Sequence, residues 1–219
     1  ELERSVGWRG EGGLWLSVEQ VVGVDAFLGL AVGAEPGITG VMAEIAGAVP
    51  RGELVGLEFR VKSAGSLKRK VATALLEDPN VDVAHVLAGL KDTVRFTLQV
   101  PDGHYVAGVE HAVGVLRGRG FEVVSFKNTW GSQGYQGINA AFREPGSGVV
   151  FELQFHTPAS FEAKMGNHEL YEQARLPGVD EATRADLAER MREAFDAVPR
   201  PDGAPQLTAT PPTVDHGLG

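Results

Sequence analysis

The sequence contains no cysteine, and this absence removes several classes of function at once. Disulfide bonds, thiolate nucleophiles and zinc sites built from cysteine are all excluded. The chain also lacks any run of eighteen or more apolar residues and any basic-then-apolar leader at Glu1, so we expect no membrane span and no targeting segment within it. A chain without cysteine suits secretion and the cytosol equally.

Basic residues are outnumbered, because 20 Lys and Arg stand against 29 Asp and Glu, which gives a net charge of −9. Sequence-independent binding of DNA or RNA depends on a broad basic surface, so we do not expect a general nucleic-acid coat. A local basic patch inside an acidic protein is suited instead to one small, highly charged anion.

The hydrophobic patterns predict an α+β protein with a mixed β-sheet of about five strands flanked by helices. We expect one domain over residues 1–198, made of N-terminal helices (1–52), a central core (53–176) and a C-terminal helix (180–198), followed by a tail (199–219) without a core of its own. The expected strands are 54–62, 92–100, 121–126, 138–143 and 149–156, and the expected helices before residue 180 are 19–30, 39–49, 66–77, 81–90, 105–116 and 158–175.

One of these strands, VVFELQFH, alternates apolar and polar side chains. Successive side chains on a strand point to opposite faces, so Glu152, Gln154 and His156 share one row. Many half-buried sheets turn such a row toward water. From this strand alone, a solvated row and a functional cleft fit equally well.

The densest basic cluster is RVKSAGSLKRK, which runs from Arg60 to Lys70. Its predicted order is strand, small-residue loop and helix N-terminus, the geometry in which free backbone N–H groups and the helix dipole receive a phosphate. We expect Arg60 and Lys62 on one strand face, and a helix with Ser66 as its N-cap and Lys70 on the same face as Ser66. A solvated run of surface charge is the alternative.

Asp92 and Arg95 open the strand DTVRFTLQV, and we place Asp92 and Glu152 each in a strand. Two carboxylates from adjacent strands are the usual way to hold Mg²⁺ against the phosphates of a nucleotide, which motivates a tertiary pairing of Asp92 with Glu152. An acid at the end of a sheet is also common as a cap or turn residue.

Tyr135 lies in GSQGYQGIN, where glycines on both sides let the aromatic ring stand clear as a stacking platform for a base. A turn before an ordinary edge strand is the alternative. The helix expected at 158–175 has a polar face that is either solvated or near phosphate. This face comprises Lys164, His168, Tyr171 and Arg175.

The order of these pieces resembles the synthetase domain of the RelA/SpoT family, the alarmone synthetases. The resembling segments, about 115 residues in the family's order, are RVKSAGSLKRKV, KDTVRFTL, FKNTWGSQGYQGIN, FELQFHT and NHELYEQAR. The resemblance implies a nucleotidyltransferase-like synthetase fold and an enzyme that uses Mg²⁺. It also implies transfer of the β,γ-pyrophosphate of ATP to the 3′-hydroxyl of a purine nucleotide, with AMP and a (p)ppApp- or (p)ppGpp-type nucleotide as products.

The resemblance further implies a role for each candidate residue. The ATP phosphates are bound by Arg60, Lys62, Ser66, Lys70 and Arg95. Mg²⁺ is held by Asp92 and Glu152, and Glu152 also takes the proton of the attacking hydroxyl. The acceptor nucleotide is bound by Tyr135, on which its purine stacks, and by Lys127, Asn139, Gln154, His156 and His168.

Three positions depart from the family pattern. Asp92 precedes Arg95 by three residues where the family usually has five, His156 stands where Arg is common, and Asn139 stands where His is common, which suggests altered handling of the acceptor. The sequence of these segments is most similar to the secreted ATP:nucleotide 3′-pyrophosphokinases of filamentous bacteria, which act on adenine as well as guanine nucleotides. This similarity implies a secreted protein, with a cytoplasmic one as the alternative.

Two other functions remain open beside this one. The first is that of toxic family members that pyrophosphorylate the 3′ end of tRNA, which predicts a wider basic surface than the charge balance favours. The second is a non-catalytic nucleotide-binding module, motivated by the short spacing between Asp92 and Arg95. The oligomeric state is left open.

Overall fold

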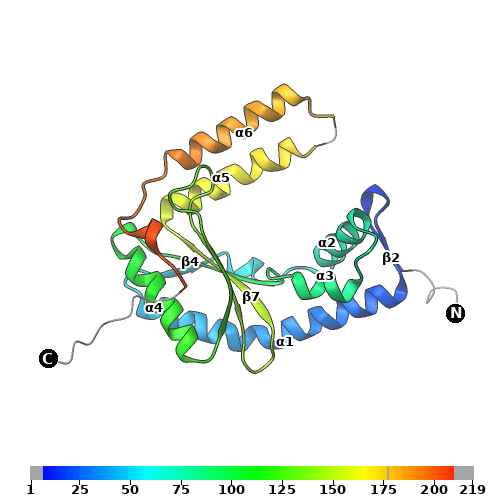
Figure 1. Ribbon diagram of the computed structural model, residues 1–219, viewed down its shortest axis with the longest axis horizontal. Helices are drawn as coiled ribbons and strands as arrows, with labels where there is room; N and C mark the ends of the chain where they lie inside the picture. Colours follow the sequence, from blue (N-terminus) through cyan, green and yellow to red (C-terminus); the bar gives the residue numbers. More distant parts are fainter. Residues whose placement is uncertain (1–6, 177, 210–219) are drawn as a thin grey trace.

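The computed structural model describes residues 7–176 and 178–209, and its centre is one mixed β-sheet (Figure 1). The sheet has the order β3-β4-β7-β6-β5, in which β4 and β7 are parallel and every other neighbouring pair is antiparallel. The predicted mixed sheet of about five strands flanked by helices is therefore confirmed. The strands are β3 (Glu53–Val55), β4 (Val94–Gln99), β5 (Glu122–Asn128), β6 (Ile138–Arg143) and β7 (Val150–His156).

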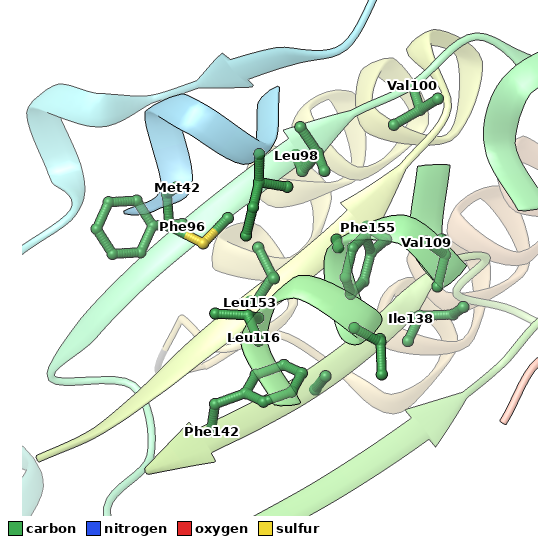
Figure 2. Packing of buried hydrophobic residues seen from close by; sticks show 14 of the residues in the cluster. Met42, Phe96, Leu98, Val100, Val109, Leu116, Ile138, Phe142, Leu153 and Phe155 are labelled. Carbon is green, nitrogen blue, oxygen red and sulfur yellow. The ribbon is translucent and has the colours of Figure 1, made fainter. Parts of the chain in front are cut away.

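One face of the sheet is apolar and forms the main core under two helices, α1 (Val18–Ala48) and α4 (Tyr105–Gly118). Phe96 of β4 pairs in register with Leu153 of β7, and both side chains are buried on this face. Figure 2 shows them in the same layer as Met42 of α1. Because alternate side chains point the other way, the polar row of β7 belongs to the opposite face.

Helix α1 is continuous, so the prediction of two separate helices at 19–30 and 39–49 is wrong. Pro36 lies inside the helix, where it removes the hydrogen bond to the carbonyl of Val32. The Val32 side chain is exposed, and on that face water can satisfy the carbonyl. At the start of the helix, Ser17 and Gln20 form a reciprocal capping box.

The first half of α1 belongs to a second hydrophobic cluster, built with α2 (Ala64–Glu77), α3 (Val83–Gly89) and residues of the short β1–β2 hairpin. Within residues 7–176 and 178–209, α1 is the one helix long and apolar enough to cross a membrane by length and composition, although the core helix of a globular protein passes the same test. The buried hydrophobic residues of α1 lie in these two clusters. The hairpin strands are β1 (Trp8–Arg9) and β2 (Trp15–Leu16).

The strand predicted over 54–62 is much shorter in the structure. Strand β3 ends before Gly56, which adopts a left-handed φ of 68°, and a 3₁₀ turn over Leu57–Phe59 follows. Val61 returns to the sheet as a single bridge to Val94. The expectation that Arg60 and Lys62 share a strand face is therefore wrong, because Gly56 ends the strand before the chain reaches Arg60.

The helix that follows the basic loop begins earlier than predicted. Ser63 is the N-cap of α2, and its Oγ accepts a hydrogen bond from the Ser66 backbone N–H at 3.2 Å. The prediction that Ser66 is the N-cap is wrong, since Ser66 already lies in the first turn. Lys70 remains one turn further along the same helix face.

The C-terminal helices α5 (Pro158–Ala174) and α6 (Glu181–Asp196) lie side by side as an arm of the molecule, and α2 and α3 lie on another side of the sheet (Figure 1). Helix α5 begins at Pro158, where the sequence predicts it, and Thr157 is its N-cap. Helix α5 leaves directly from the end of β7, so its first turns stand beside the polar face of the sheet.

Residues 199–207 pack on the main core, so the domain does not end at residue 198 as predicted. Ala204 is fully buried and Leu207 is 8% exposed within the main hydrophobic cluster. Asn128 Nδ2 donates to the carbonyls of Ala204 and Leu207 at 2.8 and 3.1 Å. The last part of the predicted tail, 210–219, lies outside the described residues.

Candidate active site

The polar face of the sheet gathers candidate residues from four strands. Register pairs Arg95 of β4 with Glu152 of β7, and Gln154 of β7 with Asn139 of β6. Asn139 is in turn paired with Lys127 of β5. Because paired residues on neighbouring strands point to the same face, these five side chains form one continuous polar surface.

A pocket of about 530 Å³ lies on this face where the sheet meets α2 and the segment after α3. Its polar lining includes two carboxylates, Asp92 and Glu152, so the structure brings the two acids to one pocket. Three cationic side chains, a backbone segment and one amide complete it. They are Lys70, Lys91, Arg95, Gly89, Leu90 and Gln154.

A second pocket of about 260 Å³ adjoins the first. Lys127 and Asn139 line it together with Ser125 and two alanines of β6, Ala140 and Ala141. Lys91 and Glu152 line both pockets, so Glu152 stands at the boundary between them. Two compartments that meet at one carboxylate can hold two reactants on either side of a single base.

Asp92 is the centre of an ion-pair group at the first pocket. Its carboxylate lies 2.8 Å from Lys70 Nζ and 3.2 Å from Lys62 Nζ. Burial raises the pKa of the Asp92 carboxyl, but the hydrogen bond from Lys70 and the charge of Lys62 outweigh burial, and the pKa lies below its usual value of 3.8. Asp92 precedes β4 rather than lying in it, contrary to the sequence prediction.

Arg60 faces away from this group and toward α1. Its Nε lies 2.5 Å from Oε1 of Glu35, and its Nη1 donates to the carbonyl of Leu57 at 2.7 Å. Glu35 is 8% exposed and also accepts a hydrogen bond from Thr39. Arg60 lines neither pocket, so the structure brings together only Lys62, Lys70 and Arg95 from the predicted phosphate-binding set.

Lys164 of α5 lies against the polar row and was not predicted as a site residue. Its ammonium donates to Gln154 Oε1. The pKa of Lys164 is lowered to about 8, first by burial and then by the charge of Arg95, while Glu152 acts in the opposite direction. Lys164 therefore belongs to the same electrostatic group as Arg95 and Glu152. The sequence did indicate a polar face on this helix that includes Lys164 and His168, and this pattern was the available sign that Lys164 could reach the site.

Tyr135 does not stand clear as a stacking platform, contrary to the prediction. Its hydroxyl lies 2.9 Å from Asn139 Oδ1 and 2.7 Å from His156 Nε2, and its ring makes edge contacts with His156 and Phe195. Burial and the charge of Glu152 raise the pKa of Tyr135 above its ordinary value. The flanking glycines let the loop fold back onto the sheet instead of exposing the ring.

His156 is fully buried and cannot touch a ligand in either pocket. Its Nδ1 lies 2.8 Å from Ser160 Oγ and its Nε2 contacts Tyr135. Burial, followed by the charge of Lys164, lowers the pKa of His156 to about 3, so the imidazole is neutral at physiological pH. The row of β7 thus divides: Glu152 and Gln154 line a pocket, whereas His156 lies behind it.

Two other predicted site residues lie on the surface. His168 is exposed on α5 and lines neither pocket. Ser66 is exposed, and its Oγ contacts Ser63 Oγ at 2.9 Å. The structure therefore does not bring these two side chains to the polar face of the sheet.

Comparison with solved structures places this arrangement in a known fold. Small alarmone synthetase 1 from Bacillus subtilis superposes with a TM-score of 0.55 at 18% identity, covering 78% of this chain and 90% of that one. A GTP pyrophosphokinase family protein from Streptococcus pneumoniae gives 0.53 at 14% identity, covering 83% and 90%. The protein smu.1046c from Streptococcus mutans gives 0.53 at 17% identity, covering 79% and 89%.

The chain has the fold of the small alarmone synthetases. No protein-family model matches the sequence, and no curated protein matches it significantly. The likeness to this synthetase fold thus comes from backbone geometry at low sequence identity.

Within this synthetase fold, the residues of the first pocket suit a divalent cation that arrives with a nucleotide. No group of three or more His, Cys, Asp or Glu side chains among residues 7–176 and 178–209 forms a metal site by itself. Mg²⁺ commonly takes only one or two protein carboxylates and completes its shell with substrate phosphates and water. Asp92 and Glu152, in one pocket, match that donor set.

Proposed function

We propose that this chain transfers the β,γ-pyrophosphate of ATP to the 3′-hydroxyl of a purine nucleotide and releases AMP. The observation that supports it best is the pair of adjoining pockets that share Glu152 and Lys91. A transferase for two nucleotides needs two compartments with one base between them, and cations rather than nucleophiles around the transferred group.

The first pocket suits the triphosphate of the donor. Lys70, Lys91 and Arg95 line it, and Lys62 reaches its edge through Asp92. Charge in phosphoryl-type transfer spreads over phosphate oxygens, so several fixed cations stabilise the transition state. ATP phosphates compete with Asp92 for the two lysine ammonium groups, and we expect Lys62 and Lys70 to turn from the carboxylate to the phosphates.

Mg²⁺ is part of the proposal. Asp92 and Glu152 would hold it, and the ion would neutralise negative charge on the phosphate oxygens. Release of the Asp92 carboxylate by Lys62 and Lys70 makes its oxygens available for this role. When the two lysines leave Asp92, their ammonium groups become free to bind the phosphates and the carboxylate becomes free to bind the cation.

The second pocket suits the acceptor nucleotide. Lys127 provides a cation for its phosphates and Asn139 a polar group for its base or ribose. Glu152, on the boundary, takes the proton of the 3′-hydroxyl as the oxygen attacks the β-phosphorus of ATP. The bond from the 3′-oxygen to the β-phosphorus forms, the bond from the β-phosphorus to the oxygen that bridges the α- and β-phosphorus breaks, and the electron pair leaves with AMP.

The direct test is to incubate the protein with Mg²⁺, ATP and AMP, ADP, GDP or GTP, and to separate the products by anion exchange. With ADP, GDP or GTP as the acceptor, AMP and a 3′-pyrophosphorylated nucleotide are expected together in equal amounts. With AMP as the acceptor, the AMP consumed and the AMP released cancel, and the product is expected in the amount of ATP lost. Glu152→Gln keeps the shape of the side chain but not its basicity, so kcat is expected to fall at least about 100-fold. Glu162→Gln, at an exposed position on α5, is the matched control.

The same assay separates the competing functions. Label from ATP that appears on deacylated tRNA, with no nucleotide product, would favour the tRNA-modifying function. Calorimetric binding of ATP without turnover of any acceptor would favour a non-catalytic module. Formation of neither product, or unchanged activity in Glu152→Gln, contradicts the proposal.

A further inference from the structure

A chain of four side chains connects the buried start of α5 to the acceptor pocket. Ser160 Oγ lies 2.8 Å from His156 Nδ1, and His156 Nε2 lies 2.7 Å from the Tyr135 hydroxyl. The Tyr135 hydroxyl donates to Asn139 Oδ1 at 2.9 Å. Only the last member, Asn139, lines the acceptor pocket. Ser160 and His156 are fully buried behind it.

The hydrogen bonds of this chain have one direction. Tyr135 has a single hydroxyl proton and donates it to Asn139, so the contact with His156 requires a proton on Nε2 of the imidazole. The neutral imidazole then has no proton on Nδ1, which must accept from the Ser160 hydroxyl. Ser160 Oγ lies closer to Nδ1 than to the Thr157 carbonyl at 3.2 Å, so the nearer acceptor takes its proton.

We propose that Ser160 and His156 are positioning residues that fix the direction of the Asn139 amide, with Oδ1 turned to Tyr135 and the Nδ2 donor turned to the acceptor pocket. The acceptor nucleotide must then present a hydrogen-bond acceptor at this point, such as a carbonyl oxygen, a ring nitrogen or a ribose oxygen. The identity of this ligand rests on the proposed function, whereas the direction of the hydrogen bonds does not.

The surroundings hold this chain in place. Gly137 lies so close to the imidazole that a Cβ there would be 3.0 Å from His156 Cε1 and 3.1 Å from the Phe155 carbonyl. The ring of His156 also makes an edge contact with Phe161. The imidazole is thus enclosed by the loop, by Phe161 and by the edge-on ring of Tyr135.

The tautomer of His156 can be read without any assay of activity. In ¹⁵N-histidine-labelled protein, long-range nitrogen–proton correlation spectra are expected to show the proton of His156 on Nε2, with Nδ1 unprotonated. The His156→Gln spectrum assigns the signal by its absence. A proton on Nδ1 in the wild-type protein would mean that the hydrogen bonds between these four side chains have the opposite direction. That result would overturn the proposal whether or not the protein is a pyrophosphokinase.

Kinetics then test the consequence for the acceptor. Ser160→Ala removes the donor to Nδ1, and the KM for the acceptor nucleotide is expected to rise about fivefold to tenfold, with the KM for ATP and kcat within twofold. Thr157→Val removes the N-cap hydroxyl of the same helix but no member of the chain, so it controls for weakening of α5. His156→Gln retains an N–H donor for Tyr135 and is expected to keep the acceptor KM near that of wild type, unlike His156→Leu. Equal acceptor KM values in Ser160→Ala and Thr157→Val would contradict the positioning role.

Discussion

Lys70 Nζ lies 2.8 Å from one carboxylate oxygen of Asp92 and 2.9 Å from the other, so one ammonium group spans both oxygens. Lys62 approaches the same carboxylate from the loop before α2. The two lysines come from one side of the donor pocket and the aspartate from another. This group therefore ties the basic segment to the start of β4 before any phosphate is bound.

Asp92→Asn is expected to lower the free energy of unfolding by about 1 kcal/mol at pH 7, because the ion pairs are only partly buried. The pKa of Asp92 is depressed in the folded protein, so its stabilising effect is present above the unfolded value of 3.8 and is lost as the pH falls through the lower folded value. Urea unfolding of both proteins at pH 7, 5 and 3 measures the difference. A difference that is unchanged at pH 3 would contradict the ion-pair explanation.

Lys164→Met is expected to change the pH dependence of stability on the alkaline side. The pKa of Lys164 is about 8 in the folded protein and 10.5 in the unfolded chain. Between these values the unfolded chain binds more protons, so the stability of the wild-type protein should rise with pH relative to the variant. Unfolding in urea at pH 7, 8.5 and 10 provides the comparison. Parallel curves for the two proteins would show that Lys164 keeps an ordinary pKa.

Arg60 and Glu35 are expected to act mainly on stability. A double-mutant cycle with Arg60→Met and Glu35→Gln should give a coupling energy of about 1 to 3 kcal/mol, because Glu35 is nearly buried and bonded to Arg60. The KM for ATP should change by similar factors in the two single variants. If Arg60→Met raises that KM manyfold while Glu35→Gln does not, Arg60 contacts the phosphates directly.

Leu207 is expected to contribute to stability although it lies in the segment predicted as a tail. Leu207→Ala should lower the free energy of unfolding by about 2 kcal/mol, since the side chain belongs to the main core. Leu76→Ala, at a position 67% exposed, is the matched control and should change it by less than about 0.5 kcal/mol. Equal effects of the two substitutions in chemical denaturation would show that the contact at Leu207 is not important.

The strands with clear alternation were predicted almost to the residue, as β6 and β7 show, because period-two patterning carries that information. Three local features were missed. Strand β3 is shorter than predicted, because Gly56 adopts a left-handed conformation. Helix α1 is continuous although it contains Pro36. Leu207, in the segment predicted as a tail, is buried in the main core. Each depends on a backbone conformation or a distant contact that a linear pattern does not record.

The site was predicted in the same uneven way. The pairing of Asp92 with Glu152 was expected from the resemblance and from two adjacent strands, and both residues line one pocket although Asp92 lies before β4. The partner of Arg60 could not be predicted, because Glu35 is 25 residues away in the sequence, on α1. Tyr135 was misjudged since glycines permit both an exposed and a folded-back loop, and only the buried His156 decides between them.

Helix α1 contributes side chains to both hydrophobic clusters. Lys70 is carried by a helix that rests on one cluster, and Asn139 by a strand that rests on the other. Since the same helix supplies side chains to both, we expect the two halves of the molecule to melt together. Thermal unfolding of the cluster that supports Lys70 would then abolish affinity for both nucleotides in a single cooperative transition.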